Sequence, residues 1–158
     1  MELKPDIVEI DEEEFYRIAG VIAKGSKKGK FAAKSPILLL PSEQKSSHRK
    51  KYYEALLKRI KNQKLKTEYL FSLPYLKSEL NRLNKTEVEK IMNWWKLLLT
   101  YKNLDLRFTD SAFDSCIIGD FRVLRKMAQK RYAIEVNSKN SKEIERDFSI
   151  IFKKSTKP

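Results

Sequence analysis

The chain has 158 residues, 41% of them hydrophobic, which is enough for one domain with a sizeable buried core. No run approaches the roughly 18 apolar residues that a membrane span needs, and the acidic start lacks the basic and then apolar pattern of a signal peptide. We therefore predict a single cytoplasmic domain over residues 1–158, with flexible ends at residues 1–10 and 155–158.

The net charge of +13 is unevenly distributed along the chain. Seven acids against Lys4 give residues 1–16 a charge of −6, which leaves +19 for the remainder. A surplus of this size favours an anionic partner, namely nucleic acid, an anionic membrane surface or an acidic protein. A lysine-rich surface that is merely solvated is the alternative explanation, because lysine supplies most of the surplus.

The chain contains a single cysteine, Cys116, within an apolar stretch. One cysteine cannot form an intramolecular disulfide, and it excludes a zinc site of the several-cysteine kind. Because its neighbours are apolar, we predict that the thiol is buried and unreactive. The sequence indicates no bound cofactor.

The first predicted element is a helix from Glu12 to about Lys24, with Asp11 as its N-cap. Its buried face repeats at helical spacing and comprises Phe15, Ile18, Ala19 and Ile22. The GSKKGK sequence of residues 25–30 ends this helix. It lacks the spacing of a phosphate-binding P-loop. The apolar run PILLLP at residues 36–41 then predicts a central strand that is covered on both faces.

A second helix is predicted over about residues 47–62, with a serine N-cap at its start. Its inner stripe comprises Tyr53, Leu56, Leu57 and Ile60. Lys51 and Lys58 fall on the opposite face, and Arg59 lies beside them. This basic face could follow a phosphate backbone, although helices on α/β domains often carry solvated faces of the same kind.

A strand is predicted over residues 65–73, and Ser72 followed by Pro74 is typical of a helix start. After a break, Thr86 and Glu89 predict a capping box for a long helix.

That long helix carries apolar residues on more than one side between residues 88 and 99. A helix of this kind is either buried on several sides or paired with another subunit. We therefore expect a homodimer.

Residues 104–124 contain three predicted strands, separated first by a polar break and then by a Gly119-Asp120 turn. We predict that they form the central hairpin of the sheet. A strand over residues 131–136 and a helix over residues 141–154 follow. This order predicts an α/β fold with one mixed sheet and helices on both faces.

Four features, in order, resemble one half of a phospholipase-D-like domain. They are the PILLLP strand, the helix-strand unit YYEALLKRIKNQKLKTEYLFSL, the paired helices and the hairpin CIIGDFRVL. The resemblance covers residues 12–154 and is to the non-catalytic members, found at the ends of archaeal regulators and of a membrane-binding MIT-domain protein of cell division.

Catalytic members of that family use a histidine, a lysine two residues on and an aspartate five beyond that. The corresponding places here hold Ala112, Asp114 and Gly119, and a shift of one residue supplies no histidine either. The chain's one histidine, His48, has Ala55 where the aspartate would be. The resemblance therefore implies a domain without phosphodiesterase activity, because the nucleophile is absent.

A cleft that once held phosphate can still bind an anion through basic side chains. The resemblance makes Arg107, Arg122, Arg125 and Lys126 candidates for that role, since they cluster around the predicted hairpin. The alternative is that they are exposed residues that protect edge strands from aggregation.

Two further hypotheses remain open. Asp114 and Asp105 could bind magnesium in a nuclease, because magnesium prefers oxygen ligands, whereas Asp110 and Asp120 are typical turn residues. Tyr52 and Tyr132 lie beside basic residues and could stack on bases, and packing is the alternative.

Overall fold

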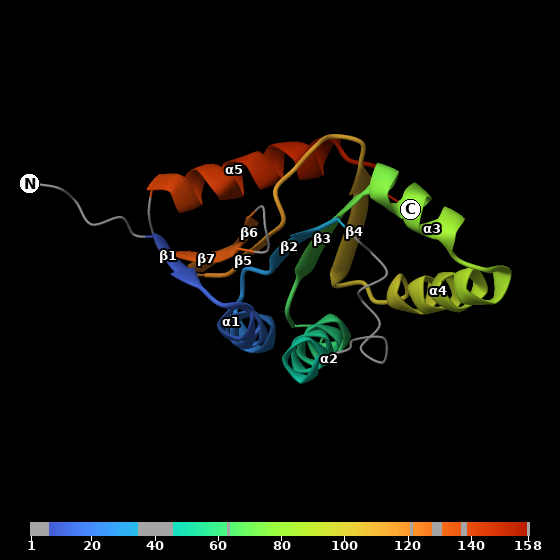
Figure 1. Cartoon of the computed structure of the whole chain (residues 1–158), viewed down its shortest axis with the longest axis horizontal. Coiled ribbons are helices and arrows are strands. Elements are labelled where there is room, and N and C mark those ends of the chain that lie inside the picture. The colour runs from blue at the N-terminus through green and yellow to red at the C-terminus, as the bar shows by residue number, and fades with distance from the viewer. Residues whose placement is uncertain are drawn as a thin grey trace, which may run out of the picture.

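A computed structural model of the chain describes residues 7–34, 46–62, 64–120, 122–127, 131–136 and 139–157 (Figure 1). Within these ranges, five helices flank one seven-stranded sheet. The order is β1 (Ile7–Ile10), α1 (Glu12–Gly25), β2 (Lys30–Ala33), α2 (Ser47–Lys61), β3 (Thr67–Ser72), α3 (Leu73–Arg82), α4 (Lys85–Leu98), β4 (Leu104–Thr109), β5 (Cys116–Ile118), β6 (Arg122–Met127), β7 (Arg131–Val136) and α5 (Lys139–Lys154).

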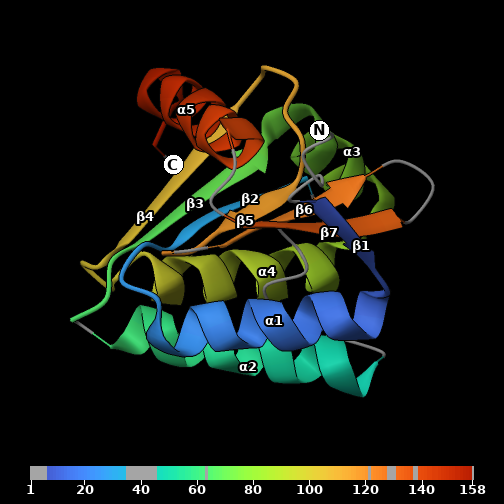
Figure 2. The ribbon, with the colours of Figure 1, turned by 90° about the vertical axis from the view of Figure 1, so that its left-hand side faces the viewer.

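The strands are ordered β1-β7-β6-β5-β2-β3-β4 across the sheet. The strands β2, β3 and β4 run parallel to one another, whereas every other neighbouring pair is antiparallel. Helices α1, α2 and α4 cover one face, and α5 covers the other (Figure 2). The predicted α/β fold, with a mixed sheet between helices, is thereby confirmed.

The larger core lies between the sheet and helices α1, α2 and α4, and it is rich in aromatic rings. Tyr69 stacks on Phe71 with ring centroids 4.5 Å apart, and Phe71 stacks on Trp95 at 6.0 Å. Stacked and tilted aromatic pairs contribute beyond the area that they bury. On the opposite face, Phe148 and Phe152 of α5 pack in a smaller core.

Local sequence signals account for most helix starts. Asp11 caps α1 by accepting a hydrogen bond from the Glu14 amide at 2.8 Å. Ser72 caps α3, as its sequence predicts. The predicted capping box of α4 is wrong by two residues, because Asn84 and Glu87 form it. Asparagine caps a helix as well as threonine does, so the earlier pair begins the helix.

Two strands contradict the sequence-based expectations. Residues 7–10, predicted to be flexible, form β1, which pairs with β7 at one edge of the sheet. Residues 30–33, predicted to belong to a connection, form the central strand β2, where Phe31 and Ala32 are buried. The predicted strand at residues 36–41 lies outside the described residues. At the other end, Thr156 pairs with Phe108, so residue 156 is bound to β4.

The stretch 104–124 does not form one hairpin. β4 lies at the edge of the sheet beside β3, whereas β5 and β6 form a hairpin near its middle. The strands β2 and β3 separate β4 from β5. The prediction of a central hairpin therefore holds for residues 116–127 alone.

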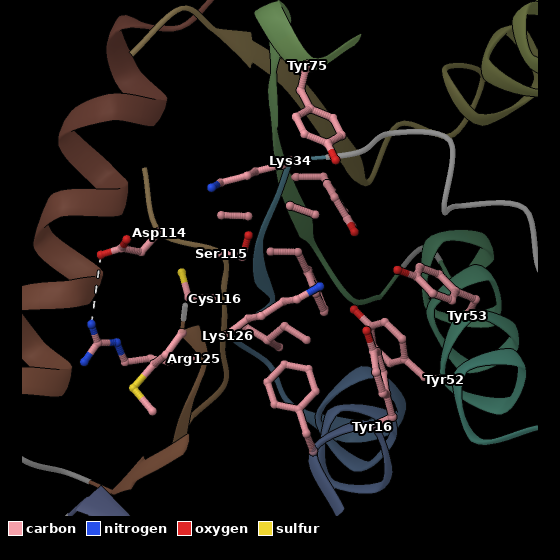
Figure 3. A pocket seen from close by; sticks show the side chains of 17 residues that line it. Tyr16, Lys34, Tyr52, Tyr53, Tyr75, Asp114, Ser115, Cys116, Arg125 and Lys126 are labelled. Atoms are coloured by element: carbon pink, nitrogen blue, oxygen red, sulfur yellow. Dashed lines mark ion pairs between the residues drawn. The ribbon is translucent and has the colours of Figure 1, made fainter. Parts of the chain in front are cut away.

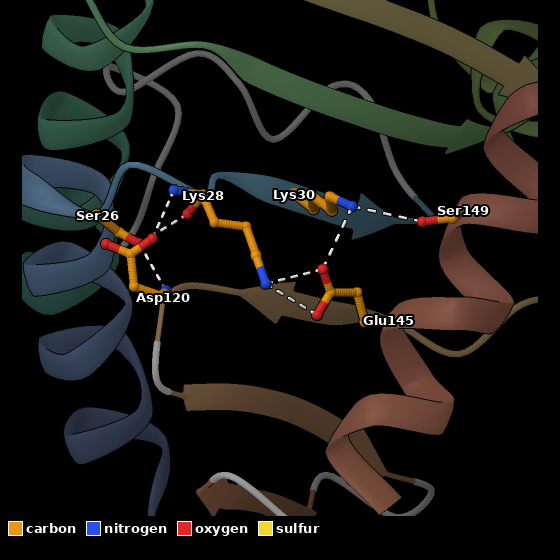
Figure 4. Close-up of polar contacts among 6 residues, drawn as sticks. All are labelled: Ser26, Lys28, Lys30, Asp120, Glu145 and Ser149. Atoms are coloured by element: carbon orange, nitrogen blue, oxygen red, sulfur yellow. Dashed lines mark hydrogen bonds and ion pairs between the residues drawn. The ribbon is translucent and has the colours of Figure 1, made fainter.

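The loop between α1 and β2 is fixed by side chains from distant parts of the chain (Figure 4). The amides of Lys27 and Lys28 donate hydrogen bonds to the Asp120 carboxylate at 2.9 and 2.7 Å. The ammonium groups of Lys28 and Lys30 pair with Glu145 of α5 at 2.9 and 3.5 Å. These contacts join the loop to the β5–β6 turn and to α5.

Candidate functional site

A cavity of about 470 Å³ lies at the ends of the central strands (Figure 3). It is bordered by the carboxyl ends of β2 and β6, by the start of β5, and by residues of α1, α2, β3 and α3. The direction of neighbouring strands changes here, since β2 is parallel to β3 and antiparallel to β5. In open α/β sheets, ligands bind in crevices outside the carboxyl ends of the strands, which is where this cavity lies relative to β2.

Tyrosines form one side of this cavity, and they come from four different elements. They are Tyr16, Tyr52, Tyr53, Tyr69 and Tyr75. Burial raises the pKa of the first four, and raises it well above the ordinary value for Tyr52 and Tyr53. These four phenols therefore stay neutral at physiological pH.

The basic residues on the cavity wall are Lys34, Arg125 and Lys126, and Lys126 points toward the tyrosines (Figure 3). Arg125 lies 4.0 Å from the Asp114 carboxylate and 3.5 Å from that of Glu135. Glu135 is fully buried, and its Oε2 has no hydrogen-bond partner within the described part of the chain. Because two carboxylates lie beside it, much of the charge of Arg125 is compensated within the protein.

Neither Cys116 nor His48 supplies a nucleophile to the cavity. The Cys116 thiol borders it but is 5% exposed, and burial, together with the charge of Asp114, raises its pKa to about 12. This agrees with the predicted unreactive thiol. His48 lies elsewhere, with its Nε2 3.2 Å from Glu12 at the junction of α1 and α2.

The resemblance to phospholipase-D-like enzymes places the catalytic positions at Ala112, Asp114 and Gly119. These three residues do not lie around one cavity. Asp114 lines the main cavity, and Ala112 lines a second one of about 270 Å³ beneath α5. Gly119 lies at the other end of β5, where a Cβ would come within 3.0 Å of Ile22. None of the three is a histidine, so the nucleophile that the catalytic members use is absent from these places.

The structure separates the predicted anion-binding arginines. Arg107 lies on the edge strand β4, where it binds Asp105 at 3.0 Å and the Phe152 carbonyl, and stacks over the Phe152 ring at 4.4 Å. Arg122 is exposed at the start of β6, and Arg125 lies toward its end. Only Arg125 and Lys126 of this predicted set line the cavity.

On α2, Lys51 and Lys58 are exposed, as predicted, but the predicted position of Arg59 is wrong. Arg59 is 2% exposed, and its guanidinium donates to the carbonyls of Ser26 and Lys66 and to the Thr67 hydroxyl. Its function is to hold the end of α1 against the start of β3, so it is unavailable to an external anion.

The two carboxylates of the nuclease hypothesis do not converge. Asp105 lies near the start of β4 and pairs with Arg107, whereas Asp114 precedes β5 and is separated from β4 by two strands. The described residues contain no group of three or more histidine, cysteine, aspartate or glutamate side chains that could hold a metal ion. The predicted ligand pair is therefore wrong.

Tyr52 and Tyr132 are each 3% exposed, so their rings belong to the core and are not available to stack on a base. The Tyr132 hydroxyl donates to Glu12 at 3.1 Å. Sequence reasoning missed Tyr16, Tyr75 and Lys34 as neighbours of the cavity. No pattern along the sequence brings these three residues together, because they come from α1, from α3 and from just after β2.

Comparison with known proteins shows similarity of fold. No family model matches the chain, and no curated protein matches it. One solved structure that is similar is that of TrmBL2, described as an archaeal chromatin protein with a novel mode of DNA binding. The TM-score is 0.62 at 14% sequence identity, over 99% of this chain and 53% of that one. This chain thus corresponds to about half the length of TrmBL2, with which it shares the α/β fold.

Proposed function

We propose that this chain is a non-catalytic, phospholipase-D-like domain that binds nucleic acid. The order of its elements resembles that family, and Ala112, Asp114 and Gly119 stand where the catalytic residues would be. The chain also shares its fold with TrmBL2, a protein described as binding DNA. Domains of one fold carry many functions, so the proposal depends on the charge of this chain itself.

The observation that carries the proposal is the distribution of ion pairs. Among the described residues, Glu9, Glu12 and Glu14 each pair with an arginine. Lys28 and Lys30 share Glu145, as shown in Figure 4. Many other lysines are exposed, with no carboxylate within ion-pair distance in the part of the chain that the structure describes; they include Lys24, Lys61, Lys64, Lys66 and Lys102.

Uncompensated lysines favour a polyanion because binding releases the ions condensed on nucleic acid. The direct test is retention of the purified chain on duplex DNA and on RNA at about 50 mM salt, with affinity measured as salt is raised. We expect the logarithm of the binding constant to fall linearly with the logarithm of the salt concentration. Absence of retention at about 50 mM salt would refute nucleic-acid binding.

We further propose that the domain is a homodimer, and α4 supports this proposal. Met92 and Leu97 of this helix and Leu99 at its C-cap are 42%, 47% and 45% exposed. Met92 and Leu99 are seven residues apart and so lie on one side of the helix, and adjoining exposed apolar side chains are typical of an interaction surface. Sedimentation at tens of micromolar tests the proposal, with Met92→Lys as the variant expected to be monomeric. A monomeric parent chain would exclude the dimer.

A further inference from the structure

The sheet register brings the starts of β6, β2, β3 and β4 and the end of β5 side by side, at one end of the strands. This end of the sheet is called the edge below. The row Val123, Ile118, Lys30, Glu68 and Asp105 crosses β6, β5, β2, β3 and β4. Because β2, β3 and β4 are parallel, the connections that enter them from α1, α2 and α4 must all reach this edge (Figure 2). The cavity described above lies at the opposite ends of the same strands.

Six exposed basic residues lie at the ends of α1 and α2, in the connections that follow α2 and α4, or at the start of β6, and we call them the basic edge. They are Lys24, Lys61, Lys64, Lys66, Lys102 and Arg122. They come from four separate parts of the chain, at residues 24, 61–66, 102 and 122, which the fold brings to the same end of the sheet. Within the described residues, none of the six takes part in an ion pair.

The acids near this edge offset only part of its charge. Asp105 is paired with Arg107, which leaves Glu68 and Asp120 against six basic side chains. The Asp120 carboxylate accepts the amides of Lys27 and Lys28 and keeps its negative charge, because these amides are neutral. Behind the edge, the guanidinium of Arg59 is bonded to backbone carbonyls and Thr67, so its positive charge adds to the local potential.

The dimensions of the edge fit a double helix. From β6 to β4 there are four strand spacings, which correspond to about 19 Å. A major groove is roughly 12 Å wide, so cations spread over this distance can reach the phosphates of both strands.

We propose that the basic edge binds the phosphate backbone of duplex nucleic acid. This inference rests on the proposed function and assigns its surface. Lysines act as point charges on phosphates and read no bases, so binding through this edge is insensitive to sequence. The arginine at the cavity is a poorer candidate, because Asp114 and Glu135 already lie beside Arg125.

Two triple variants with equal loss of charge test the surface. The edge variant carries Lys64→Gln, Lys66→Gln and Lys102→Gln. The matched control carries Lys77→Gln, Arg82→Gln and Lys85→Gln on α3 and α4, where the side chains are also exposed. Unchanged melting temperatures show that both fold.

Binding of a random-sequence duplex is measured between about 50 and 200 mM salt, alongside binding to vesicles of acidic lipid. Loss of three phosphate contacts should lower the salt slope by about 2 to 3 and the affinity at about 100 mM salt on the order of 100-fold. The control should match the parent chain within about 3-fold, since its charges lie outside the contact surface.

Each other outcome overturns the inference. Equal losses in both variants would show that net charge, and not the edge, governs binding. If the parent chain binds and neither variant loses affinity, the basic edge is not the binding surface, although the proposed nucleic-acid binding is unaffected. Loss of vesicle binding without loss of duplex binding would assign the edge to a membrane. A parent chain that binds no duplex would overturn both proposals.

Discussion

Replacing Gly29 by alanine should destabilise the fold through one side chain, Arg59. A Cβ at residue 29 would lie 2.3 Å from Nη2 and 2.5 Å from Cζ of the Arg59 guanidinium. That group cannot move freely, because it donates to the Lys66 carbonyl at 2.7 Å and to the Thr67 hydroxyl at 2.9 Å. The added methyl group must therefore break these bonds or shift the loop.

The expected cost follows from two effects. Inserting a methyl group into a packed interior costs typically about 1–3 kcal/mol, and each lost hydrogen bond to a charged group costs about 1.5–3 kcal/mol. We expect Gly29→Ala to lower the free energy of unfolding by roughly 3 kcal/mol. The two costs do not add in full, because a shift of the Arg59 side chain relieves the overlap while it weakens the hydrogen bonds. For a chain of this size, that corresponds to a melting temperature lower by roughly 6–12 °C.

A double-mutant cycle isolates the contact. Arg59→Leu removes the guanidinium and leaves the carbonyls of Ser26 and Lys66 without this donor, at a cost of about 1–3 kcal/mol for each unsatisfied group. In that background Gly29→Ala should cost less than about 1 kcal/mol, because the atoms that it would strike are gone.

Denaturant unfolding followed by circular dichroism measures each corner of the cycle. Gly20→Ala serves as the control, because a Cβ there meets nothing within 4 Å, and alanine should stabilise the interior of α1 by up to about 1 kcal/mol. An equal cost of Gly29→Ala in both backgrounds would refute the proposed contact.

Three further predictions concern titratable groups. A hydrogen bond from Arg49 is the main reason that the pKa of Glu12 is lowered to about 2. The stability that this carboxylate contributes is therefore present above its unfolded pKa near 4.5 and is lost as the pH falls toward 2. Glu12→Gln should remove this part of the acid dependence of the melting temperature. Amide hydrogen bonds from Lys28 and Lys27 lower the pKa of Asp120, so Asp120→Asn should destabilise the protein at neutral pH and much less in acid, where the parent carboxylate is itself protonated. Cys116 should react with a thiol reagent at pH 8 only after denaturation, and rapid labelling of the folded protein would contradict its burial.

Helices could be predicted from the sequence because their signals are local. Asp11 and Ser72 cap helices where the sequence places them, and the apolar spacing of α1 agrees with its buried face. The strand β2 could not be predicted this way. It has four residues and begins with Lys30, so it shows no apolar run, yet its position between β5 and β3 makes it central.

Arg59 shows why residue type can mislead. It lies three residues after Leu56 and beside Ile60, so its spacing puts it on the buried stripe of α2. Arginine is rarely buried, and this general tendency favoured an exposed position. The carbonyls at the end of α1 reverse that preference, because they need donors that only a neighbouring helix can supply.

The basic edge was beyond sequence reasoning for a different reason. The sequence favoured basic residues that lie close together along the chain, namely Lys51 and Lys58 and the arginines between residues 104 and 126. The structure places these residues on α2, β4 and β6, so they do not form one surface. Lys24, Lys64 and Lys102 are separated in sequence and become neighbours only through the parallel order of β2, β3 and β4.

Compensation of charge, more than closeness to a cavity, decides where an anion can bind this domain. An anion at Arg125 must compete with Asp114 and stay near the buried Glu135, whereas one at the basic edge meets lysines without carboxylate partners. Coulomb attraction is long-ranged at low salt and is screened within about 10 Å at 0.1 M, so the edge should dominate association at low ionic strength. Neutralising Asp114 with asparagine should therefore alter duplex binding far less than removing three lysines of the edge.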